Sequence, residues 1–253
     1  MATDLIGYFW AFRAEMKKAI PHILTLGNLV CGVLAIRAIV TGEPFLAITF
    51  VFIAAVLDFF DGFVARALGV SGELGKQLDS LADNVTFGVV PGIMLLSIAG
   101  LGGRNPEDIL GWMLFGACLL VPAMAALRLA IFNISTNQTS GFIGMPTPGN
   151  TLLIASLYYM FHEDKDGTVA QILAEPIWLL LIAFVAAIWQ ILPIPLIALK
   201  FKTWGFKENM WRYLFIATAV VLGALLQIEG IPIIIVCYFL FSMAANFSTK
   251  KVL

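Results

Sequence analysis

Eight long apolar stretches restrict the fold of this chain more than any other feature of its sequence. They run approximately over residues 22–41, 44–67, 75–100, 110–134, 147–161, 177–199, 211–228 and 231–247. Most approach the roughly 20 residues that a helix needs to cross a bilayer, and the fifth is the shortest. Backbone groups in lipid must be satisfied internally, and the alternation of a membrane barrel is absent, so we expect these stretches to be helices.

The composition agrees with a membrane protein. Of the 253 residues 60% are hydrophobic and 12% are charged, and the mean hydropathy is +0.95. These values exclude an ordinary soluble domain and predict an all-α, polytopic integral membrane bundle of about eight transmembrane helices. The net charge of -1 and the lack of a basic patch with interleaved aromatics predict no nucleic-acid partner. Cys31, Cys118 and Cys237 lie in apolar runs without CxxC spacing, so we expect small core residues.

The first 20 residues differ from the stretches that follow. Phe9 and Trp10 are accompanied by Arg13 and Lys17, which predicts an amphipathic helix lying along the membrane surface. We expect this interfacial helix in place of a cleavable signal peptide. The first span is then expected to begin near Pro21, because proline is tolerated at a helix start.

Four aspartates lie in or beside apolar runs between residues 57 and 84, where an unpaired acid costs on the order of 3 kcal/mol. Asp58 and Asp61 are spaced i,i+3 and Asp79 and Asp83 are spaced i,i+4, so each pair shares one helix face. A glycine-containing link over 66–75 is short enough to fold the second helix back. All four carboxylates could then point into one cavity. Oxygen ligands of this kind suit hard divalent cations such as Mg²⁺ or Mn²⁺.

Two other interpretations of the acids stay open at this point. The acids could only bind partner side chains, although the apolar stretches hold few basic residues to serve as such partners. They could instead form the ion site of a cation- or proton-coupled transporter. Such transporters often show inverted repeats and paired broken helices, whereas no internal repeat is visible here and the acids are confined to one helical hairpin.

The spacing of these residues resembles a known signature. The pattern is Asp58-x-x-Asp61-Gly62-x-x-Ala65-Arg66, then eight residues, then Gly75-x-x-x-Asp79-x-x-x-Asp83. It is similar to the signature of the CDP-alcohol phosphotransferase family, with every specified position present. The resemblance implies two divalent ions, one held by Asp58, Asp61 and Asp79 and the other by Asp58, Asp79 and Asp83. It also makes Asp83 the expected base for the acceptor hydroxyl.

The resemblance further implies a site for the CDP moiety and its phosphates, with Thr25, Gly62, Ala65, Arg66 and Gly75 as candidates. The small residues Gly62 and Ala65 could instead serve close helix packing, and Arg66 could be an anchor at the membrane surface. Thr25 could bond its own helix carbonyl. Gly75 is expected to allow the turn into its helix.

Asn28 is a weaker candidate for a nucleotide contact. At position 22 related enzymes often have Asn, and the histidine found here leaves a contact between His22 and the nucleotide in doubt.

Three further stretches resemble the phosphatidylserine synthase branch of that family. They are Ser80-Leu81-Ala82-Asp83 with Phe87-Gly88-Val89-x-Pro91, Arg128-Leu129-x-x-Phe132-Asn133, and Phe142-x-Gly144-x-Pro146-x-Pro148. This resemblance implies a metal-dependent transfer of a phosphatidyl group from CDP-diacylglycerol to the hydroxyl of L-serine. Glycerol 3-phosphate, an inositol phosphate or choline remain alternative acceptors.

Arg128 and Asn133 are candidates for binding the acceptor, because a buried arginine needs an anionic partner such as a carboxylate or phosphate. Arg128 could equally snorkel to the interface or pair with one of the aspartates, and Asn133 could cap its helix.

Charge in the loops predicts the orientation. In an eight-span arrangement eleven basic residues fall on one side, namely Arg13, Lys17, Lys18, Arg66, Lys76, Lys200, Lys202, Lys207, Arg212, Lys250 and Lys251. In the loops on the other side we find Arg104 and Lys165. We therefore expect both termini and the acidic site to face the cytoplasm, with the protein in the cell (inner) membrane.

The organisation predicted is a single membrane domain over 1–253. Within it, 1–20 form the interfacial helix, 21–161 the catalytic core and 162–253 the remaining transmembrane helices. The expected partners are CDP-diacylglycerol, L-serine and membrane lipids. Small residues such as Gly111 and Gly116 could support a homodimer, although packing within the chain explains them equally well.

Overall fold

The computed structural model describes residues 2–102, 105–135, 142–197 and 205–250. Its elements in chain order are α1 (Ala2–Val40), α2 (Pro44–Ala67), α3 (Glu73–Asp83), the π-helix η1 (Asn84–Val89), α4 (Val90–Ile98), α5 (Ile109–Ile134), β1 (Phe142–Ile143), α6 (Thr147–Glu163), α7 (Thr168–Ala174), α8 (Pro176–Ile188), β2 (Pro195–Leu196), α9 (Phe206–Leu226), the 3₁₀-helix η2 (Gln227–Glu229) and α10 (Gly230–Lys250). The predicted all-α membrane class is confirmed. The two short strands pair antiparallel, with Phe142 opposite Leu196.

The predicted number of eight spans is not confirmed. Among the residues that the structure describes, five segments are long and apolar enough to cross a membrane, or six if the pair α7 and α8, bent by 89°, counts as one span. The helix α6 has 17 residues and α8 has 13, so both are short for a bilayer. The stretch predicted over 177–199 loses its helix at Ile188, ahead of Pro193 and Pro195, because proline removes a backbone donor and clashes with the preceding turn.

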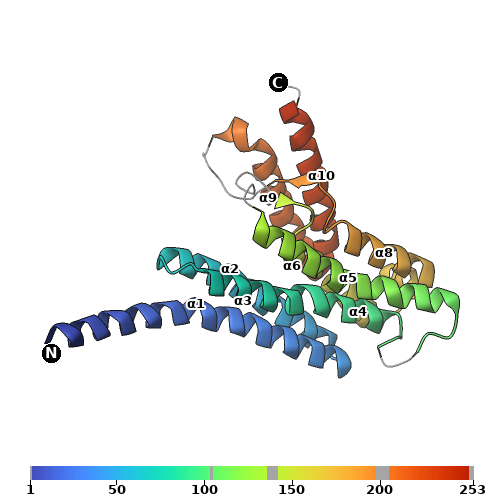
Figure 1. Cartoon of the computed structure of the whole chain (residues 1–253). Helices are drawn as coiled ribbons and strands as arrows, with labels where there is room; N and C mark the ends of the chain where they lie inside the picture. The colour runs from blue at the N-terminus through green and yellow to red at the C-terminus, as the bar shows by residue number, and fades with distance from the viewer. Residues whose placement is uncertain (1, 103–104, 136–141, 198–204, 251–253) are drawn as a thin grey trace.

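The last candidate span, Asn209–Asn246, contains two helices. The turn at Gln227 separates α9 from α10, and the two helices pack against each other (Figure 1). Two consecutive helices were predicted in this region, and the structure agrees on that point.

Helix α1 is longer than predicted. It continues through Pro21 as one helix of 39 residues, so the expected helix start at Pro21 is wrong. A proline inside a helix removes one backbone hydrogen bond without ending the helix when the neighbouring turns hold it. Figure 1 shows the N-terminal part of α1 projecting past the rest of the bundle.

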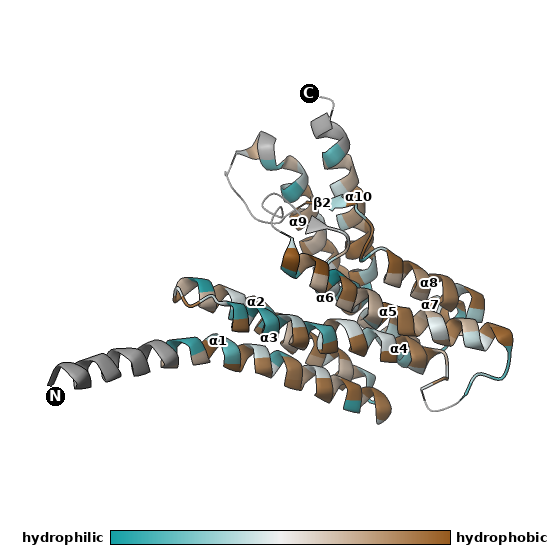
Figure 2. Cartoon of the chain, in the orientation of Figure 1, coloured by the Kyte–Doolittle hydropathy of each residue, from teal (hydrophilic) through white to brown (hydrophobic). Residues whose placement is uncertain are grey.

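The core lies where α1, α2, α4, α5, α6 and α8 meet. Ile48, Met94, Val121 and Ile154 are fully buried there and belong to one apolar cluster. Large apolar side chains such as Phe59 remain exposed on the outside, as expected for helices that face lipid. Figure 2 shows hydrophilic residues gathered near one end of α2 and α3, beside α1.

Candidate active site

Three of the four aspartates converge. Asp58 and Asp61 come from α2 and Asp79 from α3, and one carboxylate oxygen of each lies within 4.8 Å of the others. The chain reverses between the two helices over residues 68–72, where Gly69 has φ +64°, a conformation that glycine adopts without strain. Helix α1 packs against both α2 and α3 and so holds them in register.

Asp83 lies one turn further along α3 and is not part of this group of three. Its Oδ1 accepts a hydrogen bond from Nδ2 of Asn28 at 3.0 Å, and its carboxyl group is close enough to Asp58 for a hydrogen bond. Asp58 also contacts Asp79 in this way. The four acids therefore form one connected set, with Asp58 in contact with both acids of α3.

Two polar residues of α1 orient the acids. The Thr25 hydroxyl lies 2.5 Å from Oδ2 of Asp61 and 3.0 Å from the carbonyl oxygen of Pro21, and its one proton can serve either acceptor. Asn28, one turn later, bonds Asp83. The i,i+3 spacing of two polar residues in an apolar stretch was visible in the sequence, but their aspartate partners were not predicted.

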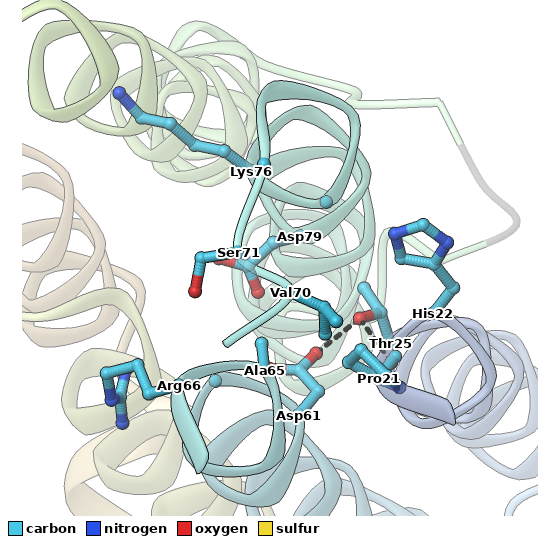
Figure 3. Close-up of a pocket in the computed structure, with 13 residues that line it drawn as sticks. Pro21, His22, Thr25, Asp61, Ala65, Arg66, Val70, Ser71, Lys76 and Asp79 are labelled. Atoms are coloured by element: carbon cyan, nitrogen blue, oxygen red, sulfur yellow. Dashed lines mark hydrogen bonds between the residues drawn. The ribbon is translucent and has the colours of Figure 1, made fainter. Parts of the chain in front are cut away.

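A cavity of about 210 Å³ opens beside the acids (Figure 3). All five residues predicted for the CDP moiety line it, namely Thr25, Gly62, Ala65, Arg66 and Gly75, together with Asp61 and Asp79. Sequence reasoning missed Ser71 and Lys76 and left His22 in doubt, although these residues also line the cavity. Arg66 and Lys76 lie on the side opposite His22.

The glycines contribute space in different ways. Gly75 lies inside α3 and not in the turn before it, so the expected entry-turn role is wrong; α3 is preceded by Gly72. A Cβ at position 75 would lie 3.5 Å from Nε2 of His22, an ordinary contact distance. A Cβ at Gly62 would come within 3.2 Å of the Arg66 guanidinium. Both glycines thus keep the wall of the cavity open.

The two residues predicted to bind the acceptor lie on α5, outside the lining of this cavity. Arg128 has Asp83 and Tyr238 as its electrostatic neighbours. Asn133 donates from Nδ2 to Oγ of Ser80 at 2.7 Å, and its backbone carbonyl accepts from the Lys76 ammonium group.

The donor set fits a hard divalent cation. All available ligand atoms are carboxylate oxygens, and within the described residues Oδ1 of Asp79 is buried without a hydrogen-bond partner. Two like charges 4 Å apart repel by about 4 kcal/mol at an effective dielectric constant of 20, so ionised carboxylates at this spacing need a neutralising partner. A bound cation would supply it, and Asp58, Asp61 and Asp79 would be its ligands.

Fold and site together define a polytopic helical membrane protein with an acidic, oxygen-rich site between its helices. The model of the CDP-alcohol phosphatidyltransferase family matches residues 18–197, and the chain belongs to this family. The resemblance drawn from the aspartate signature is thereby confirmed. Helices α9 and α10 lie beyond the matched residues.

Several similar proteins have been named. The chain is 40% identical over 142 residues to a CDP-diacylglycerol–serine O-phosphatidyltransferase of Bacillus subtilis, covering 55% of this chain and 76% of that protein. It is 35% identical over 152 residues to the enzyme of that name from Mycobacterium leprae, covering 57% of this chain and 48% of the relative. An archaetidylserine synthase of Methanothermobacter thermautotrophicus is 33% identical over 158 residues, with 61% of this chain and 64% of the relative covered. The match thus spans three quarters of the Bacillus protein but about half of the mycobacterial one.

Proposed function

We propose that this protein transfers a phosphatidyl group from CDP-diacylglycerol to the hydroxyl of L-serine, which yields phosphatidylserine and CMP. The observation that carries the proposal is the convergence of Asp58, Asp61 and Asp79 at the edge of a cavity lined by the other signature residues. The names of the relatives support serine as the acceptor.

The acidic residues and Thr25 would have different roles in the reaction. Asp58, Asp61, Asp79 and Asp83 would hold two divalent cations, Mg²⁺ or Mn²⁺. Bound there, the cations would neutralise charge on the diphosphate. The Thr25 hydroxyl would keep Asp61 oriented.

The chemical step is a substitution at phosphorus. The serine oxygen would form a bond to the phosphorus that carries diacylglycerol, the bond from that phosphorus to the CMP oxygen would break, and the serine proton would pass to Asp83. Arg66 and Lys76 line the cavity and would pair with phosphate oxygens, while Arg128 and Asn133 would bind the acceptor.

The location proposed is the cell membrane, with the active site and both termini facing the cytoplasm. The acceptor serine and the released product CMP are both water-soluble, which suits a site at the cytoplasmic end of the helices. Single cysteines introduced at Lys165 and Lys17 and labelled from outside intact cells test this. The account predicts labelling at position 165 alone, and labelling at position 17 would contradict it.

We also propose a homodimer, which the small residues Gly111 and Gly116 could support. Crosslinking of purified protein across a series of lipid dilutions measures it.

An acceptor panel tests the activity. Purified protein in vesicles receives CDP-diacylglycerol and one acceptor at a time, with and without a chelator, and CMP release is measured. We expect release with serine and its loss on chelation, and no release with glycerol 3-phosphate, inositol phosphate or choline. Release with one of these acceptors and not with serine would overturn the choice of acceptor.

A further inference from the structure

Two buried polar atoms with complementary chemistry have no partner among the described residues. They are Nε of Arg128, a donor on α5, and Oδ1 of Asn84, an acceptor at the start of η1. The elements that carry them pack against each other. A buried polar atom left unpaired costs about 1–3 kcal/mol, so two of them on facing elements call for a ligand or a functional reason.

Asn84 and Arg128 lie at about the same height along the axes of the two packed segments, α3 with η1 on one side and α5 on the other. The contact of Ser80 with Asn133 and the close approach of Gly88 to Ala125 show that α3 and η1 run antiparallel to α5. A Cβ at Gly88 would lie 3.0 Å from Cβ of Ala125 and 2.9 Å from Oδ1 of Asn84. The Asn84 amide therefore points toward α5. Position 84 is midway between Ser80 and Gly88, and the midpoint of their partners Asn133 and Ala125 is position 129, next to Arg128.

The π-helix directs neighbouring side chains to different helices. Asp83, the last residue of α3, bonds Asn28 of α1, whereas Asn84 turns toward α5. Single π-turns are frequent at functional sites because they reset the direction of side chains. Arg128 has Asp83 as an electrostatic neighbour, so both unpaired atoms flank the proposed base. The part of an acceptor beyond its reacting hydroxyl would lie between them.

We propose that Asn84 and Arg128 form the recognition site for the zwitterionic end of an amino-acid acceptor. The Arg128 guanidinium donates to the α-carboxylate, and Oδ1 of Asn84 accepts from the α-ammonium group, while the hydroxyl faces Asp83. Both contacts would be charge-assisted hydrogen bonds made by atoms that are buried in the protein. The site thereby discriminates against alcohols that lack either charged group, since their binding leaves a buried atom unpaired. This inference rests on the proposed function.

Truncated acceptors test each half of the site separately. Ethanolamine lacks the carboxylate of serine, and 3-hydroxypropanoate lacks the ammonium group. The KM of serine, and the constant for competitive inhibition of serine turnover by each truncated analogue, are measured with wild-type protein, Asn84→Leu and Arg128→Gln. We expect Asn84→Leu to raise the KM of serine about tenfold or more and to leave the inhibition constant of 3-hydroxypropanoate, which has no ammonium group, within twofold of wild type. Arg128→Gln should raise the KM of serine by a similar factor and leave the inhibition constant of ethanolamine, which has no carboxylate, within twofold of wild type.

Controls separate recognition from folding. Asn84→Ala repeats the test with a smaller side chain, and Asn105→Ala removes an exposed amide from a loop and should change nothing. Binding of CDP-diacylglycerol, measured in vesicles, should stay within twofold of wild type in every variant. An equal rise of the serine KM and of both inhibition constants, or an unchanged KM for serine in both Asn84 variants, overturns the inference. Wild-type protein that does not use serine at all refutes the proposed function instead.

Discussion

Gly32 of α1 packs tightly against Thr86 of η1, and its replacement by alanine should loosen the site. A Cβ at this position would lie 2.4 Å from Oγ1 of Thr86 and 3.1 Å from its Cα. The Thr86 hydroxyl donates to the carbonyl oxygen of Asn28 at 3.1 Å. Since ordinary contacts lie near 3.5 Å, Thr86 would have to move by roughly 1 Å. A new side-chain rotamer cannot relieve the contact fully, because the backbone Cα is also too close.

The expected destabilisation of Gly32→Ala is about 2–4 kcal/mol. Overpacking of a tight interface costs typically 1–3 kcal/mol, and loss of the Thr86 hydrogen bond adds about 1 kcal/mol. A shift of α1 also moves Asn28, which holds Asp83, so turnover should fall as well. Gly223→Ala is the matched control: apart from the local backbone of its own helix, no described atom lies within 4 Å of the added Cβ, and a helical alanine should be neutral or slightly stabilising.

Thermal unfolding in detergent and CMP release from vesicles measure both effects. The double variant Gly32→Ala with Thr86→Ala removes the hydroxyl that the new Cβ would strike. Its destabilisation should be smaller than the sum of the two single changes, because neighbouring sites couple. Strict additivity, or a Gly32→Ala protein as stable and active as wild type, would refute the steric argument.

Three substitutions in the site and one removal of metal give further tests. Thr25→Val removes the hydrogen-bond donor to Asp61 without changing the shape of the side chain. The rate of CMP release should fall about tenfold and recover in part at high Mn²⁺ concentration. A fall that Mn²⁺ leaves unchanged would contradict the orienting role of Thr25. Asp83→Asn should keep appreciable metal and nucleotide binding, measured by calorimetry, with little turnover, and near-normal turnover would remove Asp83 as the base. Asp58→Asn should abolish turnover, since Asp58 contacts the other acids, and near-normal activity of the purified variant would argue against the assignment. Chelation of wild-type protein should stop CMP release reversibly, with recovery on adding Mg²⁺ or Mn²⁺ back.

Local sequence patterns correctly predicted much of the fold and of the arrangement of the aspartates. The apolar stretch 44–67 coincides with α2, and the stretch 110–134 begins one residue after α5 does. The i,i+3 and i,i+4 spacings placed Asp58, Asp61 and Asp79 on facing helix sides, because helical geometry alone determines which residues share a face.

Tertiary contacts account for what the sequence did not predict. The continuity of α1 through Pro21 depends on its packing against α2 and α3, and propensity alone predicts a boundary at proline. The π-helix after Asp83 has no local signal, yet it turns Asn84 away from the direction of Asp83. The bonds of Thr25 and Asn28 join residues 36 and 55 positions apart in the chain, and no spacing rule reaches across such distances.

³¹P nuclear magnetic resonance of CDP-diacylglycerol added to Mn²⁺-loaded protein tests most directly whether the converging acids hold metal at the nucleotide. Wild-type protein should bind Mn²⁺, and added CDP-diacylglycerol should show strong broadening of its diphosphate ³¹P signals by the bound ion. Asp79→Asn should lose both the binding and the broadening. Equal Mn²⁺ binding by wild type and Asp79→Asn, or bound Mn²⁺ that leaves the diphosphate signals sharp, would contradict the account.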